Sequence, residues 1–268
     1  MNKILLASTL LALLPVAAHA EEDGGWSGSG ELGFAAARGN AKSESLNAKL
    51  QLGKEDDTWK NHFYLNALRN KGEVKTTVVV EGEPTTVSTF ETTANRYDAG
   101  ASVGYKLDER SYIVGALRYE NDDFSPYEYQ SVASVGYGYT LLKNERSELS
   151  FEVGPGYKRY RPVDTVTTVG DPPEIVVVHS DAEGELVGRG LVAYRHKFTD
   201  TTAFENTTLV EAGQDNTFVQ NDASLAVSIN KSFALKVGYQ VRYNSDTSPG
   251  TENTDQLLTT NLVYNFGG

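Results

Sequence analysis

Few side chains of this sequence are suited to acid–base chemistry at neutral pH. Three histidines lie beyond residue 20, at 62, 179 and 196, and imidazole is the side chain that changes charge near pH 7. His179 is followed by Ser180 and Asp181, the residue types of a serine hydrolase triad. Adjacent loop residues are not an arranged triad, and such triplets are common by chance. We therefore expect no enzyme and no catalytic residues, and keep a hydrolase only as an alternative that depends on His179.

Carboxylates also gather in several short clusters. Carboxylate oxygens are hard ligands that suit calcium or magnesium. No calcium-loop spacing is present, so the clusters predict a solvated acidic rim, with neither a metal nor a cofactor. The clusters are Glu81 with Glu83, Asp122 with Asp123, and Asp181 with Glu183 and Glu185.

The pattern around the other charged residues indicates which elements position them. In "SLNAKLQLGK", Leu46, Ala48, Leu50 and Leu52 alternate with polar residues, and a period of two is typical of a β-strand. About twelve segments show this alternation, and helical spacing fits none of them better. The segments cover residues 26–37, 43–53, 59–70, 93–107, 111–121, 128–141, 147–160, 185–198, 203–213, 217–229, 233–244 and 254–266.

The lengths of these segments and their connections favour a membrane barrel. A tilted strand needs about 9 to 11 residues to cross a bilayer, whereas globular strands average about 5 to 6. Tight polar turns such as "DER" and "KNER" follow the even segments, and longer loops such as 71–92, 161–184 and 245–253 follow most odd ones. This asymmetry predicts an all-β fold, a transmembrane antiparallel up-and-down β-barrel of about 12 strands. A soluble exported β-barrel with its apolar faces inward remains an alternative.

Aromatic residues are expected to form two girdles on the apolar faces, where amphipathic rings meet the two membrane interfaces. Near the short turns these are Trp59, Tyr105, Tyr139, Phe198, Phe204, Phe233 and Phe266, and near the long loops Tyr97, Tyr119, Tyr129, Tyr157 and Tyr243.

Charges of both signs take the opposite parity and are expected to line the lumen. A barrel of about twelve strands lies between filled barrels and open porins. Two alternatives therefore stay open, a narrow passive channel or a closed structural barrel whose charges pair with one another. The candidate lumen-lining residues are Arg96, Asp98, Lys106, Arg118, Glu120, Glu152, Lys158, Arg189, Arg195, Glu205, Lys236 and Arg242. By the same parity, His62 faces inward and His196 faces lipid, both near the short turns.

The first twenty residues indicate an exported protein. Lys3 precedes the apolar run from Ile4 to Leu14, and small residues flank His19. This pattern predicts a secretory signal peptide over 1–20, cleaved after Ala20, and leaves 21–268 as the barrel domain. The predicted location is the bacterial outer membrane, and the predicted partners are the secretion translocon, the barrel-assembly machinery, outer-membrane lipids and lipopolysaccharide. A net charge of −12 argues against binding to nucleic acid, the absence of cysteine excludes disulfides, and the oligomeric state is left open.

The chain ends in "NLVYNFGG", where Leu262, Tyr264 and Phe266 alternate with polar residues or Val263. We interpret this stripe as the lipid-facing side of the closing strand and as a candidate assembly signal. Gly267 and Gly268 follow the last aromatic residue, which departs from a strictly terminal aromatic. The strand is expected to pair with residues 26–37, because an open sheet edge in hydrocarbon leaves backbone groups unbonded.

The loops 71–92 and 161–184 are rich in β-branched residues around "EGEP" and "GDPPE". They are expected to form hairpins above the membrane. Such hairpins could merely extend barrel strands, or their free edges could bind another chain. A surface-interaction protein is therefore a further functional alternative.

Three stretches make the chain resemble a known family. They are "WSGSGELGFAAARGNAKSESLNAKLQL", "NRYDAGASVGYKLDERSYIVGALRYENDDFS" and "GYGYTLLKNERSELSFEVGPGYK". With the closing strand, the sequence resembles the salt-induced outer-membrane proteins, a bacterial group, over essentially the whole chain beyond residue 20. The resemblance implies an integral outer-membrane protein linked to salt or osmotic stress. It implies no catalytic or binding residues.

Overall fold

The computed structural model describes residues 25–38, 42–80, 83–169, 174–247 and 252–267. In these residues no helix is long and apolar enough to cross a membrane. The predicted signal peptide and its cleavage after Ala20 lie outside the described residues. The strands are β1 (Ser27–Ala37), β2 (Ser43–Glu55), β3 (Trp59–Val80), β4 (Glu83–Lys106), β5 (Ser111–Asp122), β6 (Tyr127–Lys143), β7 (Ser147–Pro162), β8 (Thr165–Val169), β9 (Glu174–Val178), β10 (Glu183–Lys197), β11 (Thr202–Ala212), β12 (Thr217–Ser228), β13 (Phe233–Asn244) and β14 (Thr254–Phe266).

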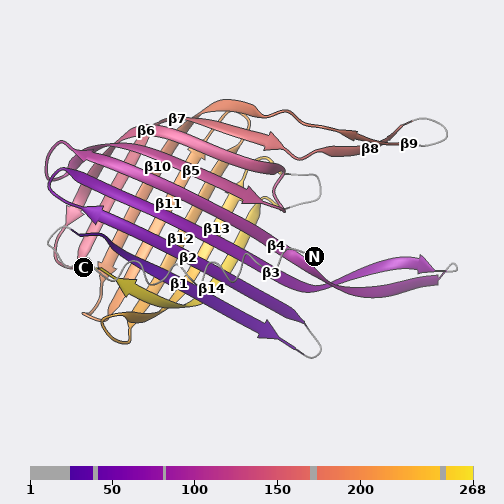
Figure 1. Cartoon of the computed structure of the whole chain (residues 1–268), viewed down its shortest axis with the longest axis horizontal. Coiled ribbons are helices and arrows are strands. Elements are labelled where there is room, and N and C mark those ends of the chain that lie inside the picture. Colours follow the sequence, from indigo (N-terminus) through magenta and orange to yellow (C-terminus); the bar gives the residue numbers. More distant parts are fainter. Residues whose placement is uncertain (1–24, 39–41, 81–82, 170–173, 248–251, 268) are drawn as a thin grey trace.

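All strands except β8 and β9 form one closed antiparallel barrel (Figure 1). Each barrel strand pairs with the next barrel strand along the chain, so the connections are simple hairpins. The sheet closes where β1 meets β14, with Gly28 opposite Phe266 and Leu32 opposite Leu262. The twelve-stranded up-and-down barrel predicted from the alternation is confirmed. Closure leaves no sheet edge in the wall, as a hydrocarbon environment requires.

The apolar face of the wall points outward. Leu117, Val153 and Leu258 are 61%, 59% and 71% exposed, whereas the charged residues Glu120 and Glu211 on the opposite face are buried. A soluble barrel would place these groups the other way round, because its apolar face must avoid water. The alternative of a soluble exported barrel is therefore wrong, and the outer surface is suited to lipid.

Aromatic side chains pair at both ends of the outer surface. At the end with the short turns, the ring centroids of Trp59 and Tyr105 lie 5.4 Å apart. At the end with the long connections, Tyr119 lies 6.2 Å from both Tyr97 and Tyr129. These are the two girdles expected from the sequence, and such rings suit the two membrane interfaces.

The short turns are fixed by side chains that bond to nearby backbone amides. The Asp56 carboxylate accepts hydrogen bonds from the amides of Thr58 and Trp59 at 2.9 and 2.8 Å. Asp108 accepts in the same way from Arg110 and Ser111. Such local bonds favour tight reversal of the chain, which sets the start of the next strand.

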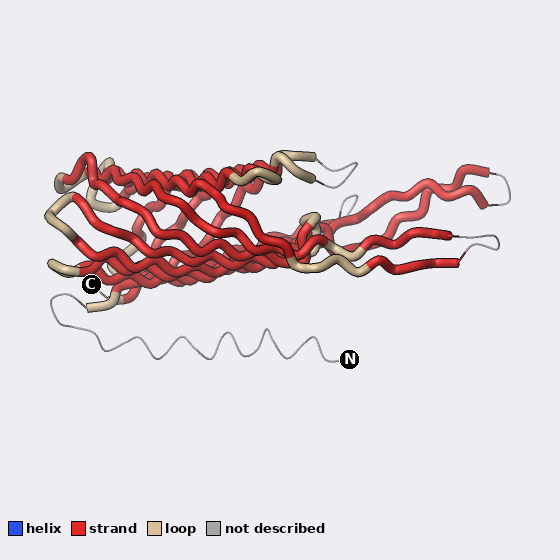
Figure 2. The backbone as a smooth tube through the Cα atoms, turned by 90° about the horizontal axis from the view of Figure 1, so that it is seen from above, coloured by secondary structure: helices blue, strands red, loops and turns tan. Residues whose placement is uncertain are grey.

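Two hairpins extend from the opposite end of the barrel (Figure 2). The segment 71–92 forms the expected hairpin by extending the barrel strands, because β3 and β4 continue through it in register from Lys71 opposite Thr92 to Val80 opposite Glu83. A register shift lies between Asn70 and Lys71, close to Gly72, where the pairing of β3 with β2 ends and the ribbon begins. The second hairpin is a separate two-stranded sheet of β8 and β9.

Candidate functional site

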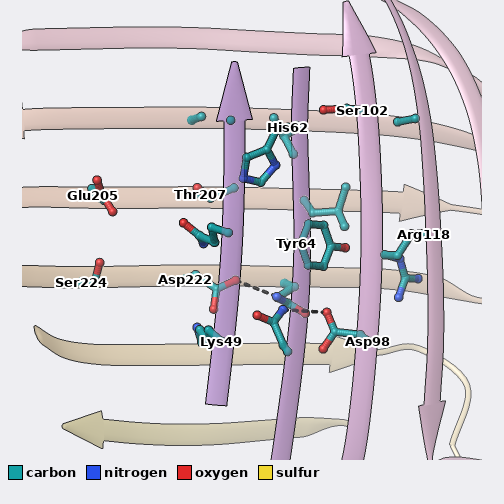
Figure 3. A pocket seen from close by; sticks show the side chains of 18 of the residues that line it. Lys49, His62, Tyr64, Asp98, Ser102, Arg118, Glu205, Thr207, Asp222 and Ser224 are labelled. Atoms are coloured by element: carbon teal, nitrogen blue, oxygen red, sulfur yellow. Dashed lines mark hydrogen bonds between the residues drawn. The ribbon is translucent and has the colours of Figure 1, made fainter. Parts of the chain in front are cut away.

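A cavity of about 600 Å³ occupies the lumen (Figure 3). Glu55, Lys60 and Glu148 line it near the short turns, and Arg118 and Glu211 line its inner end. The mouth lies at the short turns, because Arg195 and Glu205, whose side chains are 57% and 44% exposed, also line the cavity. The close-up shows its wall built from different strands, with Lys49 on β2, His62 and Tyr64 on β3, Asp98 on β4 and Asp222 on β12.

A layer of ion pairs bounds the cavity towards the long connections. Arg118 donates to Glu211 and, at 3.1 Å, to Glu120. Arg242 donates to Glu120 at 2.5 Å and to Asp122 at 3.4 Å. Glu120, Glu211 and Arg242 are each at most 3% exposed, so the layer excludes solvent. Buried charges persist only when they are paired and hydrogen-bonded, and here each carboxylate meets at least one guanidinium. We call these five residues the ion layer.

Phe218 fills the centre of the ion layer. Its ring lies 4.7 Å from the Arg118 guanidinium carbon and 5.0 Å from that of Arg242, and only 1% of the residue is exposed. A cation within about 6 Å of a ring is attracted to its π-face. The phenyl ring therefore joins the two arginines and blocks the space between them.

A second closure lies beyond the ion layer, towards the hairpins. The Lys158 ammonium lies 4.8 and 4.9 Å from the rings of Tyr127 and Tyr160 and 3.6 Å from Glu185. Tyr127 also donates to Asp246 at 3.0 Å. The half of the lumen near the long connections thus holds two layers of contacting side chains, and the cavity lies in the half near the short turns.

The structure brings the sequence-predicted lumen residues into several groups. Arg118, Glu120 and Arg242 belong to the ion layer, and Lys158 to the second closure. The others form ion pairs or hydrogen bonds around the cavity or at its mouth: Arg96 with Gln240 (2.6 Å), Asp98 with Asn66 (2.8 Å), Lys106 with Glu55 (2.8 Å), Glu152 with Arg189 (2.9 Å), Arg195 with Glu205 (3.5 Å), and Lys236 with Glu31 (2.7 Å) and Glu205 (3.8 Å).

Two important lumen residues were missed in the sequence. The side chain of Glu31 is 1% exposed and accepts from Lys236 and, at 3.0 Å, from Asn261. Glu31 lies in "SGSGELGF", where glycines obscure the alternation. It directly precedes the outward-facing Leu32, so its opposite parity could have identified it as an inward residue. Phe218 was missed because an apolar residue at an inward position resembles a lipid-facing one. Its parity with Asp222 on the same strand could have placed it inside, and the two arginines explain why an aromatic ring is accommodated there.

The triplet of residues 179 to 181 is not arranged as a hydrolytic triad. His62 lines the cavity, and His196 hydrogen-bonds to Ser147 at 2.8 Å. His179 hydrogen-bonds to Asp164 at 2.7 Å, but the Ser180 hydroxyl donates to the Val163 carbonyl at 3.3 Å rather than to an imidazole. The triplet of residues 179 to 181 therefore lacks the bond between nucleophile and base that activates a serine. Among the residues that the structure describes, no group of three His, Cys, Asp or Glu side chains is placed to hold a metal ion.

The candidate assembly stripe lies on the outer surface of the closing strand. Leu262 and Tyr264 are 48% and 40% exposed, and Tyr264 lies between Phe233 and Phe266, with centroid distances of 5.3 and 6.1 Å. The stripe thus lies on the outer surface at the seam where β14 pairs with β1.

Residues 30–266 match the family described as "Protein of unknown function, DUF481". The chain belongs to this family. It is 27% identical over 235 residues to the "Uncharacterized protein YdiY" of Escherichia coli strain K12, across 87% of this chain and 81% of that protein.

Two solved structures resemble this chain at low sequence identity. The translocator domain of the autotransporter NalP from Neisseria meningitidis is 11% identical, with a TM-score of 0.50, covering 98% of this chain and 94% of that one. The NanC porin is also 11% identical, with a TM-score of 0.48, over 91% of this chain and 100% of that one. The translocator domain thus shares the barrel fold of this chain.

Proposed function

We propose that this protein is an integral outer-membrane β-barrel that forms a narrow passive channel, held nearly closed by the ion layer. The observation that carries the proposal is the cavity of about 600 Å³, which is open at the short turns and ends at Arg118 and Glu211. Small polar solutes entering from the periplasmic side would meet hydrogen-bonding groups along the wall. They would pass only when the side chains of the ion layer move apart.

Electrostatics supports a low conductance with little preference for one sign of charge. Cavity-lining cations such as Lys236, Arg189 and Arg195 each have a carboxylate partner, so the wall offers little net charge to attract one kind of ion. The closed structural barrel is the competing function, and it differs only in whether the ion layer ever opens.

Planar-bilayer conductance of the refolded mature chain tests the proposal. The wild type is expected to give small, infrequent current steps, and the double variant Arg118→Ser with Glu211→Ser larger and more frequent ones, because it removes both members of one pair from the constriction. The matched control is Arg195→Ser with Glu205→Ser, which removes a pair at the mouth and should leave step size nearly unchanged. Folded protein without current steps in both the wild type and the first variant would refute the channel.

The proposal extends to the location and regulation of the protein: it lies in the outer membrane, and its abundance depends on external salt. The fold, the outward apolar surface and the resemblance to salt-induced outer-membrane proteins support them. Membrane fractionation should find the protein in the outer membrane. N-terminal sequencing of the mature protein should show cleavage after Ala20. Protein levels that do not change with external salt would refute the salt link without affecting the channel.

Surface interaction is a second candidate function because of the exposed hairpins. In the described residues 74–80 and 83–90 the two strands pair with each other and with no other described strand, and Ile175 on β9 is 76% exposed. Free strand edges of this kind can pair with a strand of another chain. Deletion of residues 74–90 should then abolish a binding or adhesion phenotype. An unchanged phenotype would remove this candidate.

A further inference from the structure

The outer wall carries a groove that the channel function does not use. It has a volume of about 670 Å³ and runs over β4 to β7 in the half of the barrel near the long connections. Small residues of β6, Ser131 and Ala133, form its floor, and the β5 residues Leu117 and Tyr119 form one side. The Ser131 hydroxyl donates to a backbone carbonyl at 3.3 Å, so the floor offers little polarity to a bound ligand.

A cation lies at the opposite side of the groove. Arg159 and Tyr157 on β7 pair with Ser131 and Ala133, and the arginine lies three residues before the end of its strand. Arg159 is exposed, and within the described part of the chain it takes part in no ion pair, whereas the nearby Arg161 is bound to Glu128 at 2.7 Å. The groove is thus an apolar trough with an unpaired guanidinium at the membrane interface.

We propose that this groove binds one lipid A, the phosphorylated and acylated anchor of lipopolysaccharide, through an acyl chain along Ser131 and Ala133 and a phosphate on Arg159. Arginine matches phosphate geometry by donating two parallel hydrogen bonds, and the neighbouring Tyr119 and Tyr157 are residue types that favour the interface. The choice of lipid A rests on the proposed location, because the long connections then face the outer leaflet. An inner-leaflet phospholipid would place its phosphate at the other end of the barrel.

Native mass spectrometry of the refolded mature chain, with bisphosphorylated lipid A as the probe, tests the proposal. The wild type should retain one lipid A. Arg159→Ser should bind about tenfold more weakly, because one charge-assisted interaction is lost, and Ala133→Trp should weaken binding by filling the trough. Arg69→Ser, at another exposed arginine on β3, and Val192→Trp, at an outward position on β10 that is 45% exposed, are the matched controls.

Three outcomes would overturn the site. The first is binding of lipid A by Arg159→Ser and Ala133→Trp at wild-type strength. The second is an equal loss in the two control variants, and the third is equally tight binding of phosphatidylglycerol, which would indicate general attraction of anionic lipids. Heat-modified gel migration shows that each variant is folded. None of these results depends on conductance, so failure of the lipid site and failure of the channel are distinguishable.

Discussion

Replacement of Glu120 by alanine should reveal how strongly the ion layer stabilises the barrel. The carboxylate of this residue accepts from Arg118 at 3.1 Å, from Arg242 at 2.5 Å and from Gln130 at 2.8 Å. Among the residues that the structure describes, removing it leaves the Arg242 guanidinium, 3% exposed, with Asp122 at 3.4 Å as its one remaining carboxylate. An uncompensated buried charge costs about 3 to 5 kcal/mol, and we expect Glu120→Ala to lower the free energy of unfolding by about 3 kcal/mol, since Asp122 remains.

Glu205 provides the control, because it is a lumen carboxylate that stays partly in water. It pairs with Arg195 at 3.5 Å and Lys236 at 3.8 Å, with 44% of its side chain exposed. Solvent screening limits such pairs to about 0 to 1 kcal/mol, so Glu205→Ala should lower the free energy of unfolding by less than about 1 kcal/mol. Urea unfolding in lipid vesicles, followed by tryptophan fluorescence, measures both values.

A double variant separates loss of a partner from loss of the pair. Glu120→Met combined with Arg242→Met removes both charges and fills their space, which at other buried pairs is often neutral or stabilising. The double variant should therefore be more stable than Glu120→Ala alone. Equal losses for Glu120→Ala and Glu205→Ala, or a double variant less stable than Glu120→Ala, would refute the reasoning.

Three further predictions concern other parts of the molecule. Gly154→Ala should lower the free energy of unfolding by about 1 to 3 kcal/mol, because its new Cβ would overlap a carbonyl oxygen of β6, whereas Gly190→Ala, with nothing within 4 Å, should not. The Ser180 amide and a neighbouring imidazole hold the pKa of Asp164 below its usual 3.8. The hydrogen bond from the Ser180 amide to Asp164 therefore stabilises the loop at pH values above 3.8, and this stabilisation is lost as the pH falls through the lowered pKa. The hydrogen-exchange protection factor of the Ser180 amide should fall on acidification. In Asp164→Asn the protection factor should not follow this titration. Phe266→Ala should slow insertion by reconstituted assembly machinery several-fold, and an unchanged rate would remove its role as a signal.

Much of the barrel could be predicted because every strand of its wall follows the same alternation of apolar and polar residues. A strand that separates lipid from a polar lumen must alternate, so Leu46, Leu50 and the other apolar residues identified the strands and their faces. Strand ends were harder to place. Beyond residue 70 the sequence is rich in Val and Thr, residue types that favour strands, and no local signal distinguishes a strand in the wall from a ribbon that projects beyond it.

The candidate site could be predicted only in part, because alternation fixes the face and not the partner. Parity places Arg118, Glu120 and Arg242 inside, but which charges meet depends on the curvature and stagger of the closed sheet. These properties belong to all twelve strands together. Phe218 shows this limit, since it shares the parity of Gln220 and Asp222 in its own strand, but its segment does not show that its ring meets Arg118 and Arg242.

The ion pairs across the lumen also have a kinetic consequence. Lys236 and Glu31 are 205 residues apart in the chain, and Arg242 and Glu120 are 122 apart. Such contacts form only after the sheet has curled and its first and last strands have met, since distant segments are slow to come together. Interactions absent from the transition state of folding affect the rate of unfolding rather than the rate of folding. The ion pairs inside this barrel therefore form late in assembly, and their main effect is to slow the unfolding of the completed barrel.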